Sequence, residues 1–320
     1  MNNDKQIKNM LAQAEKLGIK HQEIYKYDNF IYHKLIYKNK FEYVLNANLG
    51  RNINKFSTNI GANKDLTKII LNEAGISVPA GIIANTFEEA GEKIKKDDLE
   101  LPLVIKPYNL SLGKGVFANL SNWAELKTAY VNYQKIKKLK KTNFVVEEFI
   151  KGRDYRILIL NGKYLGCVER AYPEIKGDGK TSVRNLIKKQ LKTAGPHALL
   201  VDWEVKRNLK KGKLTFSNII EKGRIIRLRE NANAYTGGLC INRTKEVYPK
   251  FINIAKKCAR VMRYELIGVD IMIQDISDPK AKYGVIEVNS TPDYFLHDNP
   301  DIGKSENVTQ ALLKYIFKIK

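Results

Sequence analysis

Two apolar segments near the C-terminal end of the sequence carry polar residues that restrict how the chain can fold. The first, LIGVDIMI, contains Asp270, and the second, YGVIEVN, contains Glu287 and Asn289. Both segments have the length and apolar character of buried strands. Because side chains alternate between the faces of a strand, Glu287 and Asn289 point the same way. Their face is either turned toward water in a half-exposed strand, or buried with a partner that offsets the cost of burying a carboxylate.

A bound cation would be such a partner. Asp270 adds a second inward carboxylate beside Glu287 and Asn289. Three oxygen donors on two neighbouring strands suit Mg²⁺, which takes a few protein oxygens together with water and substrate phosphates. The four histidines are scattered along the chain, which argues against zinc. We therefore expect that a magnesium ion bridges these residues to a nucleotide.

A strand lysine followed by a glycine-bearing loop indicates a phosphate site. In VIKPYNLSLGKGV, Lys106 would be costly to bury unless an anion met it. Gly113 and Gly115 let the backbone fold closely over phosphates, and Lys114 adds positive charge. A GxG pair alone is common in surface turns. The segment GDGKTS resembles the tail of a P-loop, but that motif needs glycine three residues earlier, where this chain has glutamate.

Two further groups of charged residues lie around the next expected strand, NFVVEEFI. Glu147 and Glu148 are adjacent near its end, so only one of them can face inward. Asp154 and Arg156 follow, two residues apart, and can share a face of the next strand. The plain alternative for this last pair is an exposed ion pair, which contributes little to stability.

The arrangement of helical and strand patterns favours the α+β class. A chain of 320 residues can bury a sizeable core and divide into two or three lobes. Strands and helices are mixed without the strict alternation of a Rossmann sheet. The expected elements include helices near 64–75 and 123–141, and two antiparallel strands that turn at Asn161-Gly162.

The composition and charge limit which classes of partner the protein can be expected to bind. The formal charge of +22 is mostly lysine spread along the chain, and the densest run, 135–141, has apolar residues interleaved as on a solvated helix. The sequence has no zinc finger, basic zipper or RNP-like motif, so we expect no specific nucleic acid partner. It also shows no signal segment or membrane-spanning run, and its three cysteines lack metal-ligand spacing. These features predict a cytoplasmic protein with reduced thiols and no membrane partner.

Taken in order, these stretches resemble the ATP-grasp superfamily of carboxylate–amine ligases. The resemblance begins at about Asn63 and runs almost to the end of the chain. It is closest to the cyanophycin synthetases and to the ATP-grasp half of bifunctional glutathione synthetases. The matching stretches are NKDLTKIILNEAGISVPAG, VIKPYNLSLGKGV, FVVEEFIKGRDYRILILNGK, ERAYPEIKGDGKTSVRNLI, LRENANAYTGG, GVDIMIQDI and YGVIEVNSTP.

The resemblance implies roles for the residues at matching positions. Those that would hold ATP are Lys64, Lys106, Gly113, Lys114, Gly115, Glu147, Glu148 and Asp154. The ligands of Mg²⁺ (or Mn²⁺) would be Asp270, Glu287 and Asn289. The residues that would hold the acyl phosphate or an acidic substrate are Arg156, Arg170, Arg229 and Asn233.

The implied reaction joins a carboxylate to an amine through an acyl phosphate, at the expense of ATP. The substrates would be amino acids or short peptides, and a homo-oligomer would be ordinary for such relatives. The implied fold has two α+β lobes gripping ATP, with an N-terminal region over 1–62, a small lobe over 63–150 and a large lobe over 151–320. An ATP-binding module without ligase activity and a basic nucleic-acid-binding protein are the alternatives.

The chain departs from both relatives. We expect neither the Mur-ligase-like domain of the first nor the cysteine-ligase half of the second. Pro292-Asp293 stands where the cyanophycin synthetases have Pro-Gly, the residues before the glycine loop differ, and the first sixty residues match neither relative clearly. These differences concern the substrates more than the reaction.

Overall fold

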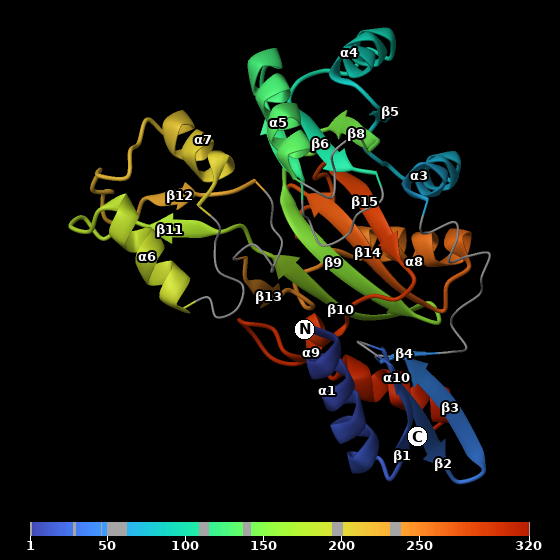
Figure 1. The fold of residues 1–320 in the computed structure, drawn as a ribbon. Helices are drawn as coiled ribbons and strands as arrows, with labels where there is room; N and C mark the ends of the chain where they lie inside the picture. Colours follow the sequence, from blue (N-terminus) through green and yellow to red (C-terminus); the bar gives the residue numbers. More distant parts are fainter. Residues whose placement is uncertain are drawn as a thin grey trace. The chain divides into compact units, whose positions relative to one another are not determined.

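The fold was examined in a computed structural model, which describes residues 2–27, 30–45, 47–49, 63–108, 115–136, 142–193, 201–230 and 238–319. Helices and strands are mixed, which confirms the expected α+β class (Figure 1). The chain forms two compact units, each built from separate stretches of sequence: 1–78, 155–169 and 240–320 in the first, and 79–154 and 170–239 in the second. The three consecutive segments expected from the sequence stay a prediction.

A five-stranded sheet is the centre of the first unit. Its strand order is β13-β10-β9-β14-β15, with helices α3 and α8 against it. The bounds of these elements are α3 Lys64–Glu73, β9 Arg153–Leu160, β10 Lys163–Arg170, β13 Cys240–Asn242, α8 Pro249–Met262, β14 Leu266–Ile273 and β15 Tyr283–Asn289.

Alternation along these strands gives the sheet two buried faces. In β9, Ile157 and Ile159 pack into a core with α8, whereas Leu158 and Leu160 pack into a second core on the other face. The expected hairpin between β9 and β10 is confirmed. Its turn residues Asn161 and Gly162 have φ values of 45° and 75°, the left-handed conformation that a two-residue hairpin turn needs.

The second core of the first unit lies among N-terminal and C-terminal elements. It joins residues of α1 and of the N-terminal sheet to residues of α10. The sheet has the order β1-β2-β3-β4. The bounds are α1 Asn2–Lys16, β1 Lys20–Tyr27, β2 Phe30–Tyr37, β3 Lys40–Leu45, β4 Asn48–Leu49, α9 Phe295–Asp298 and α10 Val308–Phe317.

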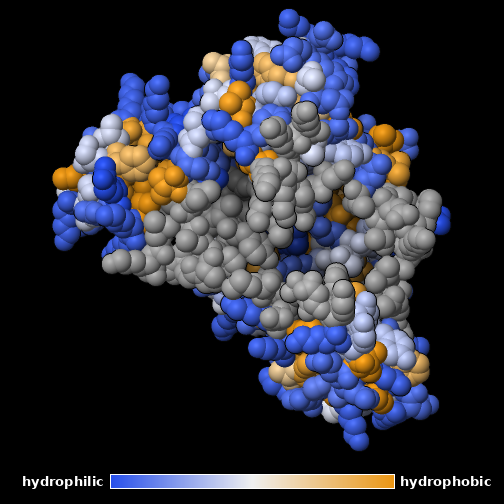
Figure 2. All heavy atoms as spheres, in the orientation of Figure 1, coloured by the Kyte–Doolittle hydropathy of each residue, from blue (hydrophilic) through white to orange (hydrophobic). Residues whose placement is uncertain are grey.

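The N-terminal sheet has one packed face and one open face. Leu35 and Val44 are buried against the helices, whereas Tyr25, Phe41 and Tyr43 are exposed. Hydrophobic and hydrophilic residues are accordingly mixed over this part of the surface (Figure 2).

The second unit contains a four-stranded antiparallel sheet with the order β5-β8-β6-β7. Helices α4 and α5 cover one face and form a core with alternate strand residues such as Ile105 and Val146. The bounds are β5 Gly81–Ala84, α4 Phe87–Lys96, β6 Leu103–Pro107, β7 Phe117–Leu120, α5 Trp123–Lys135 and β8 Phe144–Glu148.

A smaller module follows within the second unit. Strands β11 and β12 pair antiparallel, and α6 and α7 pack on them around Ile175 and Val205. The bounds are β11 Glu174–Lys176, α6 Val183–Thr193, α7 Trp203–Lys211 and β12 Ile225–Arg227.

Three expectations about whole elements can be compared with the structure. The helix expected over 123–141 ends at Lys135. The three cysteines are buried and form no disulfide with one another. No helix within the described ranges is long and apolar enough to cross a membrane.

Candidate active site

Asp270, Glu287 and Asn289 lie together on one face of the sheet in the first unit. Strands β14 and β15 are antiparallel, and the register places Asp270 opposite Glu287 and Gly268 opposite Asn289. The intervening Val269 and Val288 belong to the core on the opposite face. Because strand side chains alternate, Asp270, Glu287 and Asn289 point away from that core. The expectation that these oxygens share a face is confirmed.

Arg156 reaches this face from the neighbouring strand β9. Its Nε donates to Asp270 Oδ1 at 2.5 Å and its Nη2 donates to Oδ2 at 2.7 Å, so the guanidinium and carboxylate form a two-bond pair. Both side chains are more than nine-tenths buried. This geometry fixes the planes of both groups as well as neutralising their charges. The partner of Arg156 is thus Asp270 and not Asp154, the acid two residues away with which the sequence allows an ion pair.

The donor set suits a magnesium ion. Two carboxylates and an amide are hard oxygen ligands of the kind that Mg²⁺ prefers. Asn289 would offer its Oδ1 to the ion. Its Nδ2 is buried and has no hydrogen-bond partner among the described residues, and as an N–H donor it would be satisfied by an acceptor such as a phosphate oxygen and not by the cation. Among the described residues, no group of three His, Cys, Asp or Glu side chains is placed to hold a metal ion, so Asn289 would join the two carboxylates as the third protein ligand here.

The charges of Arg156 and Asp270 act on a fully buried histidine, His297. His297, in the short helix α9, has no solvent exposure, and neither ring nitrogen has a partner among the described residues. Burial lowers its pKa to about 3, and the positive charge of Arg156 adds to this effect while Asp270 opposes it. His297 is therefore neutral at neutral pH. The sequence offered no sign of this placement beyond the histidine itself.

Lys106 is buried in β6 of the second unit, as the sequence predicted, but its partner is a carboxylate of the protein. Its Nζ lies 2.5 Å from Glu147 Oε1, and both side chains are at least nine-tenths buried. Val104 of β6 pairs with Glu147 of β8, so the lysine and the glutamate occupy diagonal positions on the face opposite the core. This ion pair thus places a buried cation and a buried anion side by side on one face of the sheet.

The two adjacent acids of β8, and Asp154 after them, have different surroundings. Glu147 is buried, whereas Glu148 is only partly buried and accepts a hydrogen bond from the Ala80 amide at 3.0 Å, which confirms that the two adjacent acids point to different faces and only one of them is buried. Asp154 accepts from Arg170 Nη2 at 2.7 Å, so these two predicted residues lie together.

Arg229 is held by acids that the sequence analysis did not single out. Its Nη2 lies 3.0 Å from Asp202 Oδ2 and 2.9 Å from Glu204 Oε2. Glu204 is almost fully buried, and desolvation raises the pKa of its carboxyl, against the lowering effect of Arg229. Asp202 caps α7, because its Oδ1 accepts from the amide of Glu204. A capping residue and a first-turn acid of α7 thus fix Arg229.

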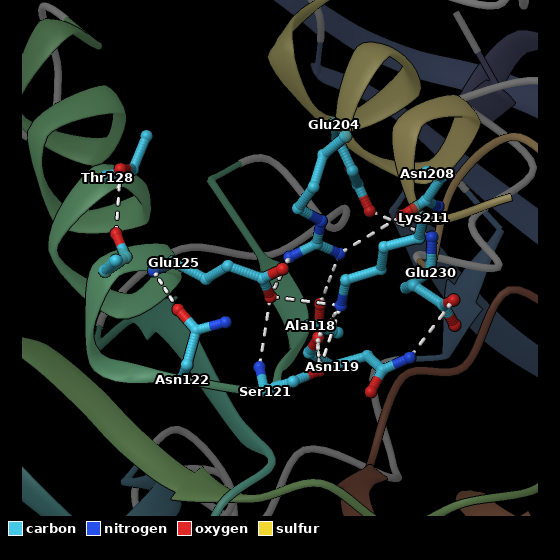
Figure 3. Close-up of polar contacts among 12 residues, drawn as sticks. Ala118, Asn119, Ser121, Asn122, Glu125, Thr128, Glu204, Asn208, Lys211 and Glu230 are labelled. Atoms are coloured by element: carbon cyan, nitrogen blue, oxygen red, sulfur yellow. Dashed lines mark hydrogen bonds and ion pairs between the residues drawn. The ribbon is translucent and has the colours of Figure 1, made fainter. Parts of the chain in front are cut away.

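A polar network joins α7 to β7 and α5 in the second unit (Figure 3). Lys211 Nζ contacts Glu125 Oε2, the Asn119 carbonyl and the Ser121 hydroxyl, each at 3.0 Å. Asn119 in turn donates to Glu230 at 3.3 Å, and the Glu230 amide donates to Glu204 Oε1 at 2.9 Å. The residue next to Arg229 is thus tied both to α7 and to β7.

The remaining predicted site residues take part in none of the contacts described above. Lys64 begins α3 in the first unit, where Asn63 caps the helix. Gly115 has a φ of 76°, a left-handed conformation that suits glycine. Gly113, Lys114 and Asn233 lie outside the described residues.

One stretch of the chain, which contains Lys106, Glu147 and Arg156 but not Asp270, Glu287 or Asn289, matches a known family model. Residues 61–185 match the family model described as "RimK-like ATP-grasp domain". Cyanophycin synthetase of Crocosphaera subtropica is 32% identical over 271 residues, which cover 81% of this chain and 30% of that protein. The glutathione biosynthesis bifunctional protein GshAB of Clostridium perfringens is 28% identical and covers 96% of this chain, but only 40% of its own length is matched.

A solved structure extends the similarity to the fold. The bifunctional glutathione synthetase from Pasteurella multocida superposes with a TM-score of 0.68 and 26% identity, over 98% of this chain and 43% of that chain. The chain thus spans less than half the length of these relatives. It has an ATP-grasp fold with a RimK-like ATP-grasp domain, and is a distant homologue of cyanophycin synthetase and of the ATP-grasp region of GshAB.

Proposed function

We propose that this protein is an ATP-dependent carboxylate–amine ligase that forms an amide through an acyl phosphate. The observation that carries the proposal is the polar face of β14 and β15, where Asp270, Glu287 and Asn289 lie together beside Arg156 in a chain with an ATP-grasp domain. The similarity to cyanophycin synthetase and to a bifunctional glutathione synthetase supports amino acids or short peptides as substrates.

The reaction has two chemical steps. A substrate carboxylate oxygen attacks the γ-phosphorus of ATP, the bond to the bridging oxygen breaks, and ADP leaves with the electron pair. The amine of the second substrate then attacks the acyl carbon, loses a proton and expels inorganic phosphate. Phosphate is a far better leaving group than hydroxide, which is why ATP is consumed. A side-chain nucleophile is unnecessary in this scheme.

The protein would contribute positioning and charge neutralisation, which dominate catalysis of phosphoryl transfer. Lys106 and Lys64 would bind phosphate oxygens, with Gly113, Lys114 and Gly115 folding over them. Glu147, Glu148 and Asp154 would contact the base and ribose. When bound, Mg²⁺ supplies Lewis-acid neutralisation of the phosphates, and Asp270, Glu287 and Asn289 would hold it.

The arginines would neutralise the negative charge of the acyl phosphate and of a substrate carboxylate. Arg156 already lies against Asp270 and would also contact the acyl phosphate. Arg170, Arg229 and Asn233 would hold a substrate carboxylate. The ion pairs of Arg170 with Asp154 and of Arg229 with Asp202 restrict both guanidinium groups before any substrate arrives.

The test measures ADP release with Mg-ATP across pools of amino acids and dipeptides, beside Glu287→Ala as the site variant. We expect release that requires both a carboxylate and an amine and that is lost in the variant. The amide product is then identified by mass spectrometry. ATP binding without turnover in any pool would favour a nucleotide-binding module, and failure to bind ATP would overturn the proposal.

A further inference from the structure

The polar face of β14 and β15 has four positions, and one of them is a glycine. The register makes a rectangle in which Asp270 faces Glu287 and Gly268 faces Asn289. Strand β9 borders β14, so Arg156 approaches from the side of Gly268 and Asp270. Three corners of the rectangle carry polar side chains, and the fourth carries none.

The space above Gly268 is already taken. A Cβ atom at this position would lie 3.1 Å from Arg156 Cδ and 3.5 Å from Arg156 Nε. It would also lie 2.7 Å from Pro292 Cβ, closer than such atoms are found in proteins. Residue 268 is not among those with a positive φ, so what glycine provides here is room and not a special backbone conformation.

We propose that Gly268 is a positioning residue: by lacking a side chain, it lets Arg156 lie across β14 and hold Asp270 beside Glu287 and Asn289. The two hydrogen bonds from Arg156 to Asp270 require the guanidinium to reach past residue 268. The same glycine lets the chain after β15 close down through Pro292. One missing side chain therefore sets the place of the arginine and of the segment that follows Asn289.

A structural measurement tests this independently of any activity. Arginine is labelled with ¹⁵N, and the Arg156 Nε–H signal is assigned by its loss in Arg156→Lys. In the wild type this N–H is hydrogen-bonded and buried, so we expect slow exchange with water. Gly268→Ala should shift the signal and speed its exchange at least tenfold. An unchanged signal in folded Gly268→Ala would overturn the inference.

Two further variants separate positioning from simple destabilisation. Gly268→Ala with Pro292→Gly removes the 2.7 Å contact and keeps the contact with Arg156, so the Arg156 signal should still be displaced. Gly91→Ala is the control, because a Cβ there meets only Trp123 at 4.0 Å and should leave the Arg156 signal unchanged. Recovery of the wild-type signal in the double variant would assign the effect to Pro292 and overturn the inference.

The activity arm rests on the proposed function. In the ligase assay, Gly268→Ala should lower kcat by less than the roughly 100-fold that a 1 Å misplacement costs, because a 3.1 Å contact displaces Arg156 by only a few tenths of an ångström, and the KM for ATP should change little. In a background that carries both Arg156→Ala and Pro292→Gly, Gly268→Ala should cost at most about twofold more, because both neighbours of the added Cβ are gone. Losses that multiply would overturn the inference. A wild-type protein that makes no amide would instead count against the proposed function, and the Arg156 signal would still decide the role of Gly268.

Discussion

At the scale of single residues, the Lys106–Glu147 pair has two roles that can be separated. Breaking a buried ion pair by removing one partner leaves an uncompensated charge, whereas replacing both partners with apolar groups is often neutral. We expect Lys106→Ala to lower the free energy of unfolding by about 3–5 kcal/mol. Lys106→Met with Glu147→Leu should cost much less, as measured by urea unfolding.

The same two variants also report on nucleotide binding. If Lys106 binds phosphate, the double variant should be stable and yet fail to bind ATP in calorimetry. A double variant as unstable as Lys106→Ala would show that the pair is not the source of the cost. A stable double variant with wild-type ATP affinity would remove Lys106 from the proposed phosphate site.

His297 should make folding sensitive to acid. The pKa of His297 is about 3 in the folded protein, below the reference value of 6.5. Between about pH 3 and pH 6.5, His297 is therefore protonated in the unfolded chain and neutral in the folded protein. Stability is therefore lost as pH falls from about 6.5 toward 3. Between about pH 7 and pH 5 this group alone should cost roughly 2 kcal/mol.

The contribution of His297 is measured as a difference, because other groups titrate in the same range. Urea unfolding of the wild type and of His297→Leu is compared at both pH values. The variant should lose about 2 kcal/mol less between them. Equal losses in both proteins would mean that His297 titrates in the folded state much as it does in the unfolded chain.

At the scale of elements, the β9–β10 hairpin offers a clean test of backbone conformation. Gly162 has a φ of 75° and open space around it, so Gly162→Ala adds backbone strain and no clash. We expect a loss of roughly 1 kcal/mol. Gly91→Ala, in the interior of α4 with room for a Cβ, should instead gain about 0.5–1 kcal/mol in urea unfolding. The same sign for both substitutions would contradict this reading of the turn.

Elements were predictable from the sequence where the pattern is local. Short apolar runs predicted β14 and β15, and the Asn161-Gly162 pair predicted the hairpin turn, because strand formation and turn conformation depend on neighbouring residues. The end of α5 was predicted six residues late, since lysines interleaved with apolar residues continue a helical pattern past Lys135.

Partners across the sheet were not predictable in this way. The sequence marks Arg156, Lys106 and Arg229 as unusual cations, but the acids that hold them are set by strand order and register. Asp270 is 114 residues from Arg156, and Glu147 is 41 residues from Lys106. Only the fold shows that these residues meet. The need for glycine at position 268 depends on the same neighbouring strand.

At the scale of the whole molecule, the charge of +22 sets how stability responds to salt. Like charges repel in the compact state, and this repulsion acts over a Debye length that falls from about 30 Å at 0.01 M to about 8 Å at 0.15 M salt. Salt also weakens surface ion pairs such as Lys93–Glu89, but exposed pairs contribute only about 0–1 kcal/mol each. The two effects have opposite signs.

We expect the repulsion to outweigh the loss of ion pairs, because basic residues outnumber acidic ones 56 to 34 and repulsive pairs of charges therefore predominate. The midpoint of thermal unfolding should therefore rise by a few degrees between about 0.01 M and 0.15 M NaCl, as about 1 kcal/mol would produce. Replacing exposed Lys188, Lys206 and Lys210 by Gln should reduce this rise, because it removes three charges that repel their neighbours. A midpoint that falls with salt would instead show that attractive pairs outweigh the net repulsion.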